Sequence, residues 1–125
     1  MNYLEQQTIE ANTPLIRRGD SPHGIYFIER GQVTVQLELD DGEIIRLRTM
    51  ETGTIVGELG VYLGDPASAT VITEIRSSVY LLSLDALKEM EETDPKIAST
   101  FHKFFATAIS KRLIETNATM QALLD

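Results

Sequence analysis

Hydrophobic and polar residues alternate along much of the chain up to residue 82, as expected for β-strands with one face in water. The clearest run covers residues 32–39, where these apolar side chains share one face: Val33, Val35, Leu37 and Leu39. Asp40, Asp41 and Gly42 follow, and Asp-Gly favours a tight turn because it adopts positive φ angles readily. The pattern therefore predicts a β-hairpin at this turn.

The second strand of this hairpin is predicted to begin shortly after the turn, over residues 44–49. Alternation places Ile45 and Leu47 in the core and Arg46 and Arg48 in water. Cross-strand pairs of opposite charge stabilise a sheet weakly. We therefore expect the two arginines to pair across the hairpin with Glu38 or with Gln36.

Four further segments are strand-like: residues 8–16, 24–29, 69–75 and 78–82. Turn residues separate several of them, including Gly19-Asp20 and Glu51-Thr52-Gly53. Short strands with frequent turns are typical of an antiparallel barrel. The expected fold class is mainly β with C-terminal helices, an antiparallel β-roll or jelly-roll barrel over about residues 8–82.

The hydrophobic period becomes helical after Ser83, a residue type that caps helix N-termini well. A short helix is predicted over about residues 84–92, and Asp94-Pro95 predicts the start of a second helix over about residues 95–124. We expect residues 1–125 to form a single domain. The last apolar residues, such as Leu123, would form a lid, contact a partner such as a second copy, or fray.

Composition and charge exclude several classes of protein. With 19 acidic and 11 basic residues the formal charge is -8, which opposes nucleic-acid binding because that binding needs a basic face. The absence of cysteine excludes disulfides and thiolate metal sites and fits a cytoplasmic setting. No apolar run approaches the ~20 residues that cross a bilayer, and no signal-peptide pattern is present at the start.

Catalysis has no candidate residues in the sequence. Its 2 histidines are His23, in a turn, and His102, in a predicted helix, whereas a cupin-type metal enzyme needs clustered histidines and carboxylates. No Ser-His-Asp or Cys-His pattern is present. We expect a protein that is not an enzyme and has no catalytic residue, metal site or cofactor.

The segment from residue 57 to residue 71 holds the candidate binding chemistry. Gly57 would let an anionic group approach the backbone, and amides at the start of the turn at residues 59–61 would point at that group. Glu58 repels anions but accepts hydrogen bonds from a hydroxyl. Together they fit a sugar phosphate; the alternative is a β-bulge with a glutamate on the surface.

Characteristic residues recur from about Ile9 to Leu113. They are Gly19-Asp20, Ile25 with Tyr26-Phe27-Ile28, Gly31 with Val33 and Val35, Gly53, Val56-Gly57-Glu58-Leu59, Pro66 with Ala69-Thr70-Val71, and Arg112-Leu113. In order and spacing this set resembles the cyclic nucleotide-binding domain family. The resemblance implies a β-roll with C-terminal helices and a cyclic nucleotide, such as cyclic AMP or cyclic GMP, as ligand. It places the binding residues at Gly57, Glu58, Leu59, Gly60, Ala67 and Ser68.

One position departs from the family pattern. Ligand-binding members carry an arginine directly after the proline of this segment, and its guanidinium binds the cyclic phosphate. This chain has Ala67 at that position. Losing a charge-assisted hydrogen bond costs about 1.5–3 kcal/mol, and breaking a buried charge pair costs ~2–5 kcal/mol. The predicted affinity for a cyclic nucleotide is therefore roughly tenfold to a few thousandfold lower than that of a relative with the arginine. Ser68, the turn amides of Gly60 and Val61, and Arg46 or Arg48 from a neighbouring strand are candidate replacements.

A second group of residues carries a closer resemblance. It consists of Arg46-Leu47-Arg48-Thr49, Val56-Gly57-Glu58, Val61-Tyr62-Leu63-Gly64, Ala86-Leu87, Met90-Glu91, Arg112-Leu113 and Asn117. These residues resemble the cyclic nucleotide-binding domain at the C-terminus of bacterial SulP-type sulfate permeases. The resemblance implies a cytosolic module of an inner-membrane transporter, with the transporter and STAS domains of the parent chain as partners.

Two functions remain open. The first is a regulatory domain that senses a small ligand, with weak or absent cyclic nucleotide binding because of Ala67. The second is a degenerate module of the same fold that acts in protein interaction or assembly, including a homodimer through the C-terminal helix. A DNA-binding regulator of the catabolite-activator type would need a helix-turn-helix domain after that helix, so the flanking sequence would identify one.

Overall fold

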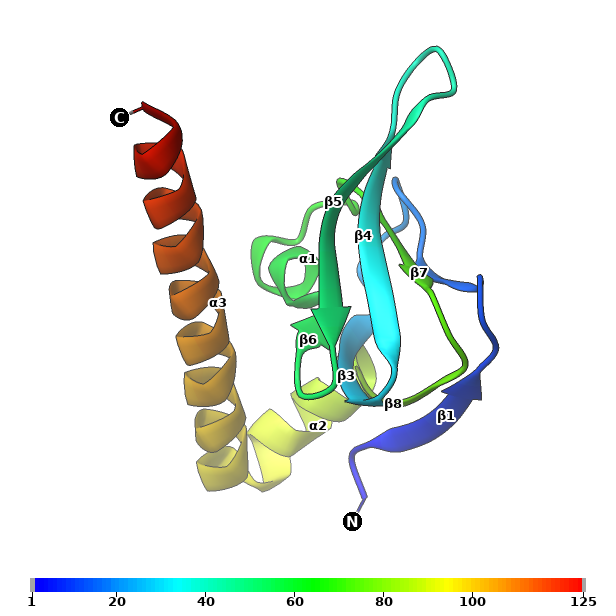
Figure 1. Ribbon diagram of the computed structural model, residues 1–125. Coiled ribbons are helices and arrows are strands. Elements are labelled where there is room, and N and C mark those ends of the chain that lie inside the picture. The colour runs from blue at the N-terminus through cyan, green and yellow to red at the C-terminus, as the bar shows by residue number, and fades with distance from the viewer. Residues whose placement is uncertain (1, 125) are drawn as a thin grey trace. The chain divides into compact units, whose positions relative to one another are not determined.

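The computed structural model describes residues 2–124. Antiparallel strands dominate the chain up to residue 83, and helices dominate it afterwards (Figure 1). The elements are β1 (Glu5–Ile9), β2 (Pro14–Ile16), β3 (Gly24–Arg30), β4 (Gln32–Glu38), β5 (Ile44–Glu51), β6 (Ile55–Val56), α1 (Glu58–Leu63), β7 (Thr70–Thr73), β8 (Ser77–Ser83), α2 (Leu84–Thr93) and α3 (Pro95–Leu124). This confirms the expected fold class.

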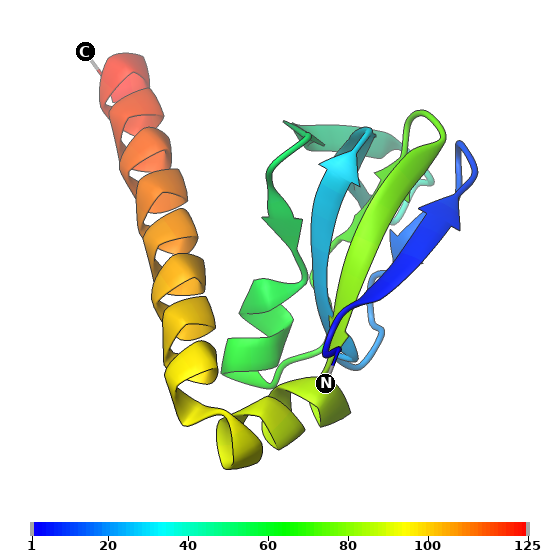
Figure 2. The same cartoon turned by 90° about the horizontal axis from the view of Figure 1, so that it is seen from below.

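The strands form two sheets, in the orders β1-β8-β3-β6 and β2-β7-β4-β5. Segments far apart in sequence are therefore neighbours, as Figure 2 shows for β1, in blue, beside β8, in yellow-green. The inner faces of both sheets contribute to one buried cluster: Leu15, Ile16, Tyr26, Ile28, Val33, Met50, Val56, Val71 and Val79. Burying this apolar surface is the main force that holds the two sheets together as a β-roll.

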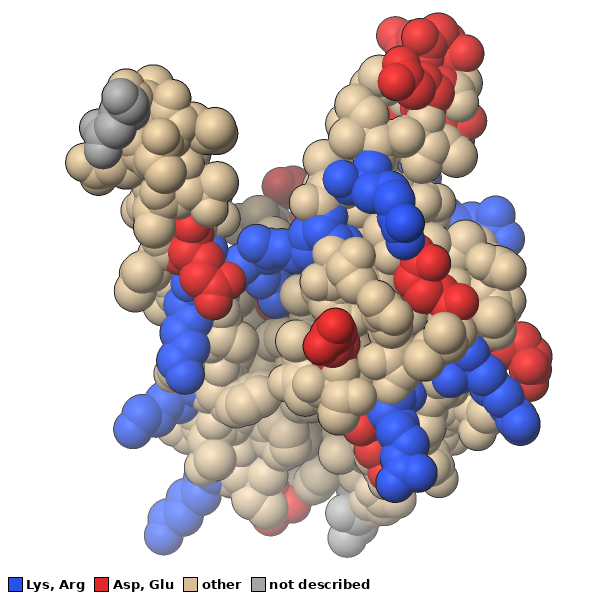
Figure 3. Space-filling view, in the orientation of Figure 1, with Lys and Arg blue, Asp and Glu red and all other residues tan. Residues whose placement is uncertain are grey.

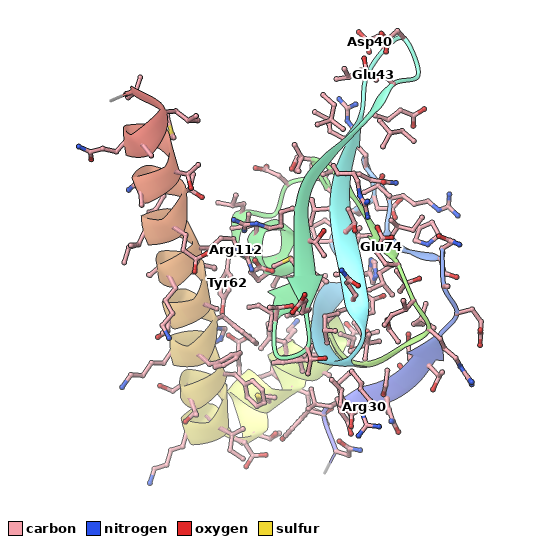
Figure 4. All side chains as sticks on the ribbon, viewed as in Figure 1. Arg30, Asp40, Glu43, Tyr62, Glu74 and Arg112 are labelled. Atoms are coloured by element: carbon pink, nitrogen blue, oxygen red, sulfur yellow. The ribbon has the colours of Figure 1, made fainter. Side chains whose placement is uncertain are left out.

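The hairpin between β4 and β5 turns where the sequence predicts. The Leu39 amide donates to the Glu43 carbonyl at 2.8 Å, and the Gly42 amide donates to the Leu39 carbonyl at 2.9 Å. Gly42 has a φ of 86°, which glycine adopts without steric cost. Acidic side chains cover the tip of the hairpin (Figure 3), where Figure 4 labels Asp40 and Glu43.

The predicted facing of β5 is wrong at three positions: Ile45, Leu47 and Arg48. Arg48 was expected in water but lies opposite Val35 of the inner face. Ile45 is 40% exposed and Leu47 is 54% exposed, although alternation placed both in the core. The register between the strands shifts: Val35 lies opposite Arg48, and the next residue of β4 lies opposite Arg46. Leu47 is the extra residue of this β-bulge, which breaks the alternation of faces. A pattern of hydrophobic positions cannot reveal such an insertion.

Arg46 faces outward as predicted, but its partner is Glu74 rather than Glu38 or Gln36. Among residues 2–124, Arg48 pairs with neither Glu38 nor Gln36, so the expected pairing is wrong for both arginines. Its guanidinium forms an ion pair with Glu74 and donates to the Thr34 hydroxyl oxygen at 3.2 Å. The Thr34 hydroxyl donates to the same carboxylate, which Figure 4 labels. The hydrogen bond from Thr34 and then that from Arg46 lower the pKa of Glu74 below its ordinary value of 4.5.

This ion pair predicts a small dependence of stability on pH. A carboxyl whose pKa falls on folding stabilises the folded state above its unfolded-state value of 4.5, and this stabilisation is lost as pH falls through the lower folded-state pKa. Glu74→Gln should therefore lower the unfolding midpoint slightly at neutral pH, and its difference from wild type should shrink in acid. Thermal unfolding at a series of pH values tests this, and a difference that stays constant into acid would contradict it.

Internal contacts divide the chain into two compact units, with the boundary between Lys88 and Glu89. The first unit holds the β-roll and the start of α2, whose N-terminus is capped as predicted: the Ser83 hydroxyl oxygen accepts from the Ala86 amide at 3.1 Å. In the second unit Phe105 is fully buried, and its ring contacts that of Phe101 at a centroid distance of 5.9 Å. Among residues 2–124, no helix combines the length and hydrophobicity that a membrane crossing requires.

Candidate ligand-binding site

Gly57 marks the start of the site, at the N-terminus of α1. Its φ of 92° lies in the left-handed region that residues with a Cβ avoid. A Cβ added here would lie 2.7 Å from the Gly24 carbonyl oxygen and 3.2 Å from Cδ1 of Ile16. The fold itself therefore requires glycine at this position, whether or not a ligand approaches it.

Glu58 follows directly and is only 1% exposed. The alternative of a β-bulge with a surface glutamate is therefore wrong. A buried carboxylate is costly unless it has partners, and Glu58 takes part in a polar or electrostatic contact. Among residues 2–124 no buried side-chain oxygen or nitrogen lacks a hydrogen-bond partner. A carboxylate buried in this way is held in position, as an acceptor for a ligand hydroxyl must be.

One of the backbone amides that the sequence predicted to bind an anion is hydrogen-bonded within α1. The Val61 amide donates to the Gly57 carbonyl at 3.3 Å, as in an α-helix. The expectation that this amide is free for a phosphate is therefore wrong. Leu59 is 49% exposed on this helix, and Gly60 is half-buried.

Ala67 lies on the segment that leads into β7. Its amide donates to the Asp20 carbonyl at 2.9 Å, and its carbonyl accepts from the Gly19 amide at 2.8 Å. Its methyl group packs against the buried cluster, whereas Ser68 is exposed. The backbone at residue 67 is thus held in place, but its side chain offers no positive charge.

The loop between β2 and β3, together with the first residue of β3, contacts both halves of the site. The Gly24 carbonyl lies against Gly57, and a Cβ on Gly60 would be in contact with Pro22 at 3.4 Å. The same loop forms both backbone hydrogen bonds with Ala67. The sequence predicted only a turn in this loop. The pairs Gly19-Asp20 and Ser21-Pro22 were the signal that its conformation is fixed.

A separate groove of about 480 Å³ lies on the second sheet, where its lining includes Arg17, Arg18, Gln36 and Ile72. Gln36 and Ile72 alternate along their strands with residues of the inner face, so this groove opens on the outer face. The groove shares Thr70 with the segment at residues 57–71, but it opens on the face of the sheet opposite to the buried cluster that Ala67 contacts. Within residues 2–124, no group of three or more His, Cys, Asp or Glu is placed to hold a metal ion.

Comparison with known proteins gives matches over most of the chain. The sequence profile described as "Cyclic nucleotide-binding domain" matches residues 6–94. The cAMP-activated global transcriptional regulator Vfr of Pseudomonas aeruginosa is 28% identical over 113 residues, which cover 87% of this chain and 53% of that protein. A cyclic nucleotide-gated potassium channel of Rhizobium etli is 32% identical over 111 residues, which cover 87% of this chain and 28% of that protein.

Solved structures show the same fold. A cyclic nucleotide-binding domain from Methylobacillus flagellatus superposes with a TM-score of 0.84 at 23% identity, covering 90% of this chain and 64% of that one. The c-di-GMP responsive global regulator CLP of Xanthomonas campestris superposes with a TM-score of 0.81 at 24% identity, covering 98% of this chain and 61% of that one. The chain spans about half or less of the length of the two curated relatives described above.

Proposed function

Because the chain belongs to the cyclic nucleotide-binding domain family, we propose that it is a regulatory domain that senses a cyclic nucleotide, such as cyclic AMP or cyclic GMP, with low affinity. The observation that carries the proposal is the buried Glu58 next to Gly57, whose backbone lies against the first residue of β3, Gly24. In this proposal the Glu58 carboxylate accepts a hydrogen bond from the ribose hydroxyl. Ala67 accounts for the low affinity, since a methyl group cannot offset the charge of the phosphate.

The parent protein is the second part of the proposal. The family relatives include a potassium channel and a transcriptional regulator, which supports a regulatory module attached to a larger protein. The resemblance to SulP-type permeases supports a sulfate-type anion transporter as that parent, with this domain on the cytoplasmic side beside its STAS domain. The net charge of -8 supports a role without nucleic-acid contact.

An interaction or assembly module is the alternative function. It is favoured by the apolar side chains that α3 exposes: Leu113, Ile114, Met120, Leu123 and Leu124. A helix with such a surface can pair with a second copy of itself and bury it. In this alternative the chain binds no nucleotide and forms a homodimer through α3.

Titration with cyclic AMP, followed in an amide proton–nitrogen correlation spectrum, distinguishes the two functions. Sensing predicts that the amides of residues 57–63 and 67–71 shift progressively as the ligand reaches millimolar concentration. Adenosine, which lacks the phosphate, is the matched ligand control and should cause smaller shifts. Shifts confined to the groove at Arg17 and Arg18, or no shifts at all, would contradict nucleotide sensing at this site.

A further inference from the structure

Arg48 stands in a row of residues that crosses three strands. Val35 of β4 lies opposite Arg48 on one side and opposite Val71 of β7 on the other. Directly opposed residues of antiparallel strands project from the same face of the sheet. Val71 belongs to the buried cluster and Val35 packs against it. Arg48 therefore lies on the inner face of the β-roll.

Arg46, two residues earlier, is in a different environment. Its side chain is 60% exposed and forms the ion pair with Glu74 on the outer face. The bulge at Leu47 separates the two arginines, so that their neighbours across the hairpin face opposite sides. Of the two arginines on β5, Arg48 is the one that faces the interior.

Arg48 forms no ion pair with any described residue. The residue is half-buried, and within residues 2–124 its side chain makes no hydrogen bond. A cation that is partly removed from water loses hydration that only a nearby anion or hydrogen-bond acceptor can offset. An anionic ligand at the inner face would supply that partner.

The inner face at Arg48 is also the face onto which residue 67 packs. Ala67 and Val35 both pack against the buried cluster. Val71 lies on β7, which begins shortly after Ala67. Adjacent strands lie about 4.8 Å apart, so the backbones of Arg48 and Val71 are separated by about 10 Å. Ala67 offers no positive charge on this face, whereas Arg48 of β5 does.

We propose that Arg48 binds the phosphate of the cyclic nucleotide in this chain, in place of the arginine that is missing at position 67. A guanidinium can donate two parallel hydrogen bonds to a phosphate, and Arg48 approaches from β5 rather than from the segment before β7. This assignment rests on the proposed function and adds the group that holds the anion.

The test compares Arg48→Gln with Arg46→Gln, a matched removal of charge on the outer face of the same strand. Cyclic AMP is titrated into wild type and both variants, and the amide correlation spectrum also reports whether each variant is folded. Arg48→Gln should weaken cyclic AMP binding by about tenfold to a hundredfold, as expected for a charge-assisted hydrogen bond. Arg46→Gln should bind like wild type, and Arg48→Lys should recover part of the loss.

Adenosine separates phosphate binding from a general effect on the site. Its weak binding should be the same in wild type and Arg48→Gln, because it carries no phosphate. Equal cyclic AMP affinity in wild type and Arg48→Gln would overturn the assignment of Arg48 and leave the proposed function standing. Absence of cyclic AMP binding in both wild type and Ala67→Arg would overturn the proposed function, and the assignment of Arg48 with it.

Discussion

Gly57→Ala is expected to lower the free energy of unfolding by about 2–4 kcal/mol. An alanine at a φ of 92° is strained, and its Cβ would lie 2.7 Å from the Gly24 carbonyl oxygen, a backbone atom that cannot rotate away. The β6–α1 connection would have to move away from β3, and Glu58 would move with it. Chemical denaturation followed by circular dichroism measures the loss.

Gly53→Ala is the matched control for this prediction. Gly53 has nearly the same φ, 91°, but a Cβ there would meet nothing within 4 Å. Its cost should be only the strain of the left-handed backbone, about 1 kcal/mol. The excess cost at Gly57 then measures the close approach to β3. Equal losses in the two variants would show that this contact contributes nothing to stability.

The hairpin at Asp41-Gly42 and the helix starts at Ser83 and Pro95 could be predicted from sequence because their signals are local. A turn or a cap depends on a few consecutive residues, whose backbone preferences are intrinsic. The antiparallel β-roll was expected from the many short strands. The pairing of β1 with β8 was not, since it joins segments at opposite ends of the β-roll.

The candidate site was predicted less completely. Gly57 and Glu58 were identified, but burial of the carboxylate depends on tertiary packing, and the short Gly-Glu motif by itself favoured a surface position. The bulge at Leu47 was missed because it is a property of the pairing between two strands. That single insertion decides which of the two β5 arginines faces the interior, so the candidate phosphate contact could be selected only from the structure.

Ala67→Arg is expected to tighten cyclic AMP binding by about tenfold to a hundredfold. The backbone at residue 67 is already fixed by its two hydrogen bonds to the loop between β2 and β3, so a new side chain starts from an ordered position. A guanidinium there would add a charge-assisted, bidentate contact to the phosphate. Ala67→Gln adds a side chain of similar polarity without the charge and should leave the affinity close to that of wild type.

Calorimetric titration of cyclic AMP into wild type, Ala67→Arg and Ala67→Gln tests most directly whether this β-roll is a nucleotide site that lacks only its usual phosphate arginine. We expect weak binding by wild type and Ala67→Gln and clearly tighter binding by Ala67→Arg. If folded Ala67→Arg binds no more tightly than Ala67→Gln, the phosphate does not lie beside residue 67, and the proposed site is contradicted.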